Sequence, residues 1–267
     1  MRAYRAVFKL RLTLGMQYRA AALAGLSTQF FWGLMSIMVY DAFYSHTSAV
    51  PDMSFGQVVT YIWLQQAFLT FVMLWFRDPE LFGMITSGNI AYELCRPCGI
   101  YGFWYAKLVA QRLSAAMLRC LPILLVALVL PGRYRLSLPA NPGAALLFVI
   151  TLFLGLLVLV AISMLIYISV FYTMSPNGSV MLMAILGEFF SGMIIPIPLL
   201  PSWIQQIAYM LPFRLSADFP YRVYSGHIPW QDAVPGVGIQ LLWLALLAGF
   251  GYLWLNRALK RVIIQGG

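Results

Sequence analysis

Long uncharged runs of apolar residues set the predicted architecture of the chain. Residues 20–40, 53–76 and 233–256 contain no charged side chain, and about 20 apolar residues in a helix suffice to cross the hydrocarbon core of a membrane. Residues 136–187 are also uncharged, and this run is long enough for two crossings. A Ser-Pro-Asn-Gly turn lies within it at 175–178, so we predict a fourth span before this turn and a fifth span after it.

The third predicted span is less regular because it carries charges. Arg119 and Arg133 are too close in sequence for a crossing to fit between them. This helix is therefore predicted to begin near Tyr101. Its length then includes three cations, Lys107, Arg112 and Arg119. We expect Arg112 to extend along the helix to the lipid headgroups, as long basic side chains do in membrane helices.

Prolines mark the end of the fifth span and the start of an irregular external segment. Proline removes a backbone donor and interrupts helices, so we end the fifth span near Ile195, before the prolines at 196, 198, 201 and 212. Residues 196–232 then form an external segment before the sixth span. The predicted fold class is all-α and integral to the membrane, with residues 1–267 as a single transmembrane domain of six helices. Six spans place both termini on one side.

Composition supports a chain surrounded by lipid. Hydrophobic residues make up 62% of the chain and charged residues 9%, whereas soluble chains carry about 25% charged residues. A soluble globular protein is therefore excluded. Nucleic-acid binding requires a solvated basic face with interleaved aromatic residues, and no stretch is polar enough to form one. We expect membrane lipid, and no nucleic acid, around this chain.

The distribution of lysine and arginine orients the predicted spans, because cytoplasmic flanks carry an excess of these residues. With cytoplasmic termini the inner side holds eleven of the 17 cations: Arg2, Arg5, Lys9, Arg11, Arg19, Arg77, Arg96, Lys107, Arg257, Lys260 and Arg261. The outer side then holds four: Arg133, Arg135, Arg214 and Arg222. This excess predicts that both termini are cytoplasmic. The basic start without a transit segment favours a bacterial cytoplasmic (inner) membrane.

Residues 1–19 are predicted to form an interfacial helix on the cytoplasmic leaflet. The helical period separates basic from apolar positions: Arg2, Arg5 and Lys9 on one face, Tyr4, Val7, Phe8 and Leu14 on another. A secretory signal does not fit, because cations continue to Arg19 and no small-residue cleavage pattern follows the apolar run. A frayed basic N-terminus is the alternative.

The residue types that catalysis or metal binding requires are not gathered in the sequence. An intramembrane enzyme needs a nucleophile with a base or a cluster of metal ligands, and the two histidines, His46 and His227, fall in predicted external loops. No phosphate-binding G-x-x-x-x-G-K-[ST] motif occurs. Cys95 and Cys98 form a lone C-x-x-C, which supplies too few ligands for structural zinc. We therefore predict no catalytic residue, metal or cofactor on this chain.

Glu188 and Arg119 are the ionisable residues predicted to lie nearest the middle of the membrane. Glu188 falls about 13 to 14 Å along a helix from Ser179, and Arg119 about 18 Å before Pro131, at about 1.5 Å per residue. Either charge alone in lipid costs several kcal/mol, so we expect an ion pair or a water-filled cavity. The pair would then either line a transport pathway or fix helix register.

The residues between the second and third spans carry a resemblance to a known family. Residues 77–100 predict a short amphipathic helix with a Gly-Asn interruption. In order, this segment contains Gly88, Asn89, Ile90, Leu94, Arg96 and Pro97, and Lys107 follows where the chain enters the third span. This order is similar to that of the membrane subunits of type 2 ATP-binding-cassette exporters. A second block also looks like the external segment of that family, where short re-entrant helices dip back from the outer face: residues 192–196, 200–203, 211–213 and 224–226.

The resemblance implies partners and a division of labour. It implies two permeases, alike or related, on a pair of ATPase subunits that bind ATP and Mg²⁺, with substrate moving between the permeases. Residues 79–96 would be the coupling helix that contacts the ATPase, through Thr86, Ser87, Asn89, Tyr92, Glu93 and Arg96. The external segment would gate the exit or form a packed cap, with the gate candidates Pro196, Pro201, Trp203 and Pro212.

We favour an export permease driven by a separate ATPase that alternates between inward-open and outward-open states. An ion-coupled secondary transporter is the alternative, and it needs ionisable groups at a central site, for which Glu188 and Arg119 are the candidates. A structural membrane subunit without a transport path is a third class. An apolar cavity without charge clusters favours a hydrophobic or amphiphilic substrate.

Overall fold

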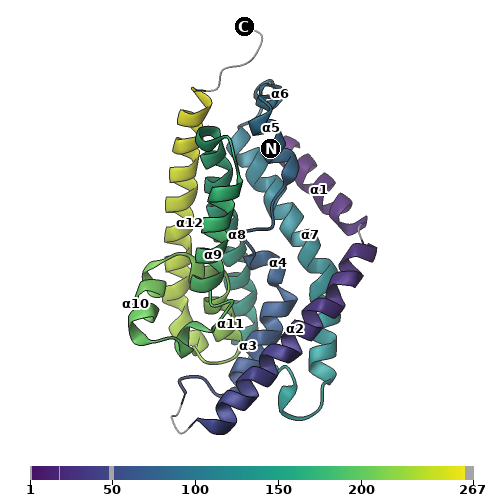
Figure 1. Cartoon of the computed structure of the whole chain (residues 1–267), viewed down its shortest axis with the longest axis vertical. Coiled ribbons are helices and arrows are strands. Elements are labelled where there is room, and N and C mark those ends of the chain that lie inside the picture. Colours follow the sequence, from purple (N-terminus) through teal and green to yellow (C-terminus); the bar gives the residue numbers. More distant parts are fainter. Residues whose placement is uncertain (1, 18, 48–50, 262–267) are drawn as a thin grey trace.

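Helices aligned along one axis form the body of the molecule (Figure 1). The computed structural model describes residues 2–17, 19–47 and 51–261, and side chains in these ranges except at 19–24. Within them the chain contains helices and no strand. Three helices are long and apolar enough to cross a membrane: α7 (Ile100–Val129), α8 (Pro142–Thr173) and α12 (Trp230–Leu259). They coincide with the predicted third, fourth and sixth spans.

The helix α8 is the centre of the bundle. It contacts α4 (Leu69–Val72), α7, α9 (Asn177–Phe190), α11 (Asp218–Tyr224) and α12. Its sequence is apolar on all sides, which is the pattern of a membrane span: one side packs against the other helices, and Leu146, Val149 and Phe153 are exposed. Gly155 lets the short 3₁₀ helix η3 (Phe213–Ser216) approach closely, because a Cβ there would collide with the backbone of Leu215 and Ser216. On α12, Gln240 donates to the carbonyls of Thr151 at 2.8 Å and Leu215 at 2.9 Å.

The second predicted span is not one continuous helix over 53–76, so that prediction is wrong. Helix α3 (Phe55–Ala67) ends at Phe68, where φ is −108° and ψ is 23°. After the single turn of α4, Met73 is extended, with φ −69° and ψ 113°. An uncharged run measures apolar length and not helical continuity. The break leaves backbone carbonyls without helical partners inside the bundle, and a side chain of α7 donates hydrogen bonds to them.

The fifth predicted span also ends earlier than the sequence predicted. Helix α9 has 14 residues and stops at Phe190 rather than near Ile195. The chain turns at Gly192, whose φ is +81°. A Cβ at Gly192 would collide with the hydroxyl of Tyr61. The glycine therefore ends the helix before the first proline can do so.

The N-terminal helix is present as α1 (Arg2–Gln17), and residues 1 and 18 of the predicted interfacial segment lie outside the described residues. The three basic residues that the helical period placed together, Arg2, Arg5 and Lys9, are exposed. Val7 on the apolar face is buried, and α1 packs along α7. Leu14, expected on the same apolar face, is 38% exposed.

The predicted interrupted helix at 77–100 is confirmed as two short helices. Helix α5 (Pro79–Thr86) and helix α6 (Ile90–Leu94) are joined by a turn in which Gly88 has φ +76°. In Figure 1 these two helices, α1 and the C-terminal end of α12 lie at one end of the molecule. The C-terminal end of α2 (Arg19–His46) and the start of α3 lie at the opposite end.

Residues 196–232 contain four short helices before the start of α12: η2 (Ile197–Leu199), α10 (Ser202–Met210), η3 and α11. Pro196, Pro201 and Pro212 each stand at the position just before one of these helices. Proline suits helix starts because an N–H group at that position would have no partner within the helix, so its absence removes no helical hydrogen bond. The prolines therefore begin helices in this segment as well as separating them.

Candidate functional site

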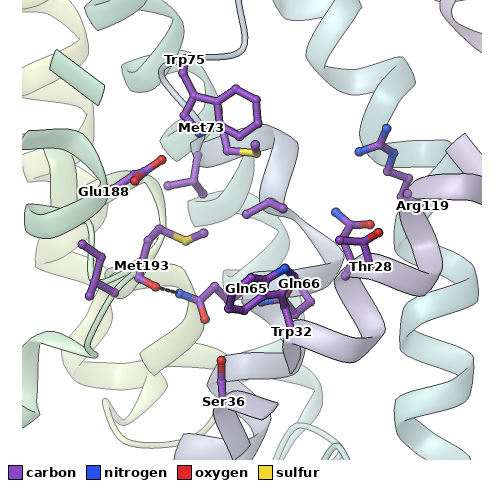
Figure 2. A pocket seen from close by; sticks show the side chains of 15 residues that line it. Thr28, Trp32, Ser36, Gln65, Gln66, Met73, Trp75, Arg119, Glu188 and Met193 are labelled. Carbon is purple, nitrogen blue, oxygen red and sulfur yellow. Dashed lines mark hydrogen bonds between the residues drawn. The ribbon is translucent and has the colours of Figure 1, made fainter. Parts of the chain in front are cut away.

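A cavity of about 550 Å³ lies between α2, α3–α4, α7 and α9 (Figure 2). Helix α2 supplies residues at helical spacing, so that one face of it lines the space. The end of α3, α4 and the chain after it, one residue of α7, and α9 with the chain after it supply the rest. The lining residues are Gly25, Thr28, Gln29, Trp32, Ser36, Gln65, Gln66, Leu69, Val72, Met73, Trp75, Arg119, Glu188, Met193 and Ile194.

The break in the second span creates part of this wall. Gln65 and Gln66 stand at the end of α3, and the extended chain after α4 brings Met73 and Trp75 to the cavity. Gln65 donates its amide N–H to the carbonyl of Met193, which ties α3 to the turn after α9. A continuous helix over this region would present a different set of side chains.

The cavity contains buried polar atoms that have no hydrogen-bond partner among the described residues. Gln29 is 5% exposed, and neither its amide nitrogen nor its amide oxygen has a partner. The Nε of Arg119 is also buried without a partner, and the guanidinium lies over Gly25, where a Cβ would come within 3.3 Å of it. A buried unsatisfied polar group costs about 1–3 kcal/mol. Such groups are suited to accept or donate to a molecule that enters the cavity.

Arg119 and Glu188 line the same cavity but do not form an ion pair. Figure 2 shows the two side chains on opposite sides of the space, and the salt bridges of the described residues do not include this pair. The prediction of a direct pair is therefore wrong, and the alternative of a shared cavity fits the geometry. Arg119 comes from α7 and Glu188 from α9.

The prediction that Arg112 extends to the lipid headgroups is also wrong. Its side chain is buried, with 1% exposure, and it donates to three backbone carbonyls and one hydroxyl. The acceptors are Thr70 at 2.9 Å, Met73 at 2.8 Å, Phe76 at 3.1 Å and the Ser163 hydroxyl at 3.2 Å. Arg112 therefore satisfies the carbonyls that the broken second span leaves free, and it holds the extended chain that carries Met73 and Trp75.

An ionic cluster joins the end of the bundle to α5. Lys107 of α7 lies 3.0 Å from the carboxylate of Asp78 and 2.9 Å from that of Glu80, and Arg11 of α1 also pairs with Glu80. Burial alone would raise the pKa of Glu80, but the hydrogen bonds and charges of Lys107 and Arg11 outweigh it and lower the pKa from its ordinary 4.5. This cluster was not predicted from the sequence.

Asp78 also fixes the start of α5. Its carboxylate accepts from the backbone N–H of Glu80 at 2.9 Å and of Leu81 at 3.4 Å, as an N-cap. Its own N–H donates to the hydroxyl of Tyr167 on α8 at 2.7 Å, and Phe82 stacks on the same ring. Helix α5 is thus attached to α1, α7 and α8.

The residues expected to contact a partner have different exposures. Thr86, Ser87, Asn89, Tyr92 and Arg96 are exposed on α5, α6 and their flanks, and Tyr92 is 75% exposed. Glu93 is an exception: it is 5% exposed and forms a salt bridge with Arg96 at 3.0 Å. It therefore stabilises α6 from inside and does not belong to the exposed surface of this segment.

The predicted external gate residues do not line the cavity. Pro196 and Pro212 are buried, whereas Pro201 and Trp203 are exposed. From the chain that follows α9, the residues that line the cavity are Met193 and Ile194.

The external segment is held against α3 by a buried carboxylate. Asp218 is fully buried, forms a salt bridge with Arg222 at 3.2 Å and accepts from the N–H of Ile197 at 3.3 Å. Tyr61 of α3 donates to the carbonyl of Gly192 at 3.1 Å and approaches Asp218 at 3.4 Å. The segment is thereby fixed in place beside the cavity.

Comparison with known proteins identifies one family. Residues 30–266 match the family described as ABC-2 family transporter protein. The matched range begins inside α2 and contains α5, α6 and most of the cavity lining, while α1 precedes it. The curated proteins give no match.

Proposed function

This chain belongs to the ABC-2 transporter family, and we propose that it is the permease subunit of an ATP-binding-cassette exporter for an amphiphilic substrate. It is a multi-pass membrane protein, and the family is the membrane component of a transporter that associates with an ATP-binding-cassette ATPase. The observation that supports the proposal is the cavity lined by α2, the broken second span, α7 and α9. Its walls combine tryptophan and methionine side chains with amides and two charges.

The proposed coupling connects the α5 and α6 end of the molecule to the cavity. The exposed surface of α5 and α6 is the proposed contact with the ATPase, which binds ATP and Mg²⁺. The ionic cluster around Lys107 connects that surface to α1, α7 and α8, and Arg112 connects α7 to the cavity wall. Motion imposed on α5 therefore has a chain of direct contacts to the cavity.

We further propose six crossings of a bacterial cytoplasmic membrane, both termini in the cytoplasm, and a second permease, alike or related, beside this one. Helices α2, α3–α4 and α9 supply the three crossings beyond α7, α8 and α12. The run of α3 and α4 is interrupted and α9 is short, so these crossings depend on the four short helices of the external segment and on Arg112 to satisfy the interrupted backbone.

The export proposal is tested with the intact complex in inverted membrane vesicles. The chain should co-purify with an ATPase from the native membrane, and ATP should drive a cationic or zwitterionic fluorescent amphiphile into inverted vesicles. A matched preparation with a hydrolysis-deficient ATPase should not accumulate the probe. Co-purification without an ATPase, or ATP-driven uptake only in right-side-out vesicles, would contradict the proposal.

The orientation is tested by cysteine labelling. In a background without native cysteines, Ser137→Cys should react with an impermeant maleimide in intact cells. Ser175→Cys should react only after permeabilisation, because it lies between α8 and α9 at the end of the molecule that carries α5 and α6. Both residues are exposed. Reversed labelling would invert the proposed topology. Ser48, a further external position in the predicted topology, lies outside the described residues.

A further inference from the structure

We propose that the cavity recognises a zwitterionic amphiphile, with its cationic group at Glu188 and its anionic group at Arg119. The inference rests on the proposed function and names the substrate class of that same cavity. It starts from the arrangement in Figure 2, where the two charged side chains face one space from opposite sides.

Neither charge is neutralised by another described residue of the chain. Glu188 and Arg119 form no salt bridge within the described residues. The other charged groups at depth behave differently, since Lys107 has two carboxylates and Arg112 has four acceptors. An unneutralised charge among apolar helices costs several kcal/mol. A ligand that carries the complementary charge offsets this cost.

The two charges lie on opposite sides of the cavity. A simple cation would neutralise Glu188 and leave Arg119 alone, and a simple anion would do the reverse. A ligand with both charges on one body neutralises both, and its net charge of zero adds none to the membrane interior. Separation across the cavity also selects against ligands whose two charges are too close to reach both sides.

The walls of the cavity combine apolar surface with amide groups. Trp32, Trp75, Met73 and Met193 supply aromatic and thioether surface that packs against an apolar body. Tryptophan faces also attract organic cations, and methionine adapts to varied shapes. The unpartnered amide of Gln29 and the amide of Gln66 offer hydrogen bonds to a polar linker between the two charged groups.

The test measures binding by the full chain with its ATPase, without ATP, in a non-ionic amphipol that contains no zwitterionic lipid. Four probes share a dodecyl chain: a dimethylammonio-propanesulfonate (sulfobetaine), a trimethylammonium, a sulfonate and a maltoside, each below its critical micelle concentration. We expect the sulfobetaine to bind about tenfold more tightly than the others, since only this probe makes a charge-assisted contact at both Glu188 and Arg119. Equal affinity for all four probes would overturn the inference.

Two substitutions separate recognition from structure. Glu188→Gln should weaken the sulfobetaine about tenfold and leave the sulfonate unchanged, and Arg119→Gln should weaken the sulfobetaine and leave the trimethylammonium unchanged. Arg257→Gln, an exposed position on α12, is the matched control and should change none of them. Equal weakening of every probe by either cavity substitution would contradict the assigned roles. The wild-type probe series decides the question even where a variant fails to fold.

The source of the zwitterion is resolved by competition. Phosphatidylethanolamine added to the amphipol complex should displace the sulfobetaine if the natural ligand is a membrane lipid, and should leave it bound if the ligand is a smaller soluble amphiphile. Failure of the inference is distinct from failure of the proposed function. ATP-driven export without sulfobetaine preference would refute the ligand class alone, and sulfobetaine preference without ATP-driven export would refute the exporter alone.

Discussion

Substitution of Arg112 by methionine provides the strongest test of how the broken second span is stabilised. The guanidinium serves the carbonyls of Thr70, Met73 and Phe76 and the hydroxyl of Ser163. Methionine has similar length and can fill the space, but it donates no hydrogen bond. The substitution therefore removes the hydrogen bonds while leaving most of the packing.

The expected loss follows from the three carbonyls. Each buried acceptor left without a donor costs about 1–3 kcal/mol. Part of this cost is offset because Arg112 is itself a buried cation that forms no salt bridge within the described residues. We expect a loss of about 3–5 kcal/mol in the free energy of unfolding. Arg112→Lys should lose about half as much, because one ammonium cannot reach all four acceptors.

The measurement is reversible unfolding of the purified chain in mixed micelles by titration with dodecyl sulfate. Arg119→Met is the matched control on the same helix, since Arg119 makes no hydrogen bond or salt bridge within the described residues, and it should cost less than about 1 kcal/mol. Because Arg112 holds the chain that carries Met73 and Trp75, the variant should also lose affinity for cavity ligands. A loss for Arg112→Met as small as that of the control would refute the stabilising role.

Three further predictions concern the other parts of the molecule. Because the pKa of Glu80 is lowered, the contribution of Glu80 to stability is present at neutral pH and is lost as pH falls below about 4.5. Glu80→Gln should therefore flatten the dependence of stability on acidic pH. The change should be less than about 1 kcal/mol, since the side chain is 55% exposed. Tyr92→Ala should reduce ATPase co-purification about tenfold without changing the melting temperature, because its ring is exposed; an unchanged yield would remove it from the contact. In a double-mutant cycle on the free energy of unfolding, the effects of Arg119→Gln and Glu188→Gln should add within about 0.5 kcal/mol, and a larger coupling would show that the two residues pair.

Local signals in the sequence determined much of the fold. Uncharged runs of sufficient length located α8 and α12, and the apolar and basic faces of residues 1–19 predicted α1. Helix α7 carries three cations and was located by the length that a crossing needs before Arg133. Asn141 followed by Pro142 marks the start of α8, where the asparagine side chain accepts from the N–H of Ala144 at 2.7 Å. Gly88 marks the turn between α5 and α6. These features depend on neighbours within a few residues, so they can be recognised without the tertiary structure.

The sequence located only part of the candidate site. Arg119 and Glu188 were recognised because charges stand out in apolar runs, and both line the cavity. Gln29, Gln65 and Gln66 were missed, although three amides in otherwise apolar segments are themselves a signal. Glutamine is neutral, so a search for charged residues in apolar runs does not find it.

Only the tertiary structure decided where the second span breaks and which groups meet. Arg112 reaches a carbonyl 42 positions earlier in the chain, and the turn at Gly192 depends on Tyr61, which lies 131 positions earlier. The burial of Glu93 and the separation of Arg119 from Glu188 likewise depend on how helices pack side by side. A helix in a membrane bundle can be interrupted wherever another element supplies donors for its freed carbonyls, and the identity of that element is a property of the packing and not of the local sequence.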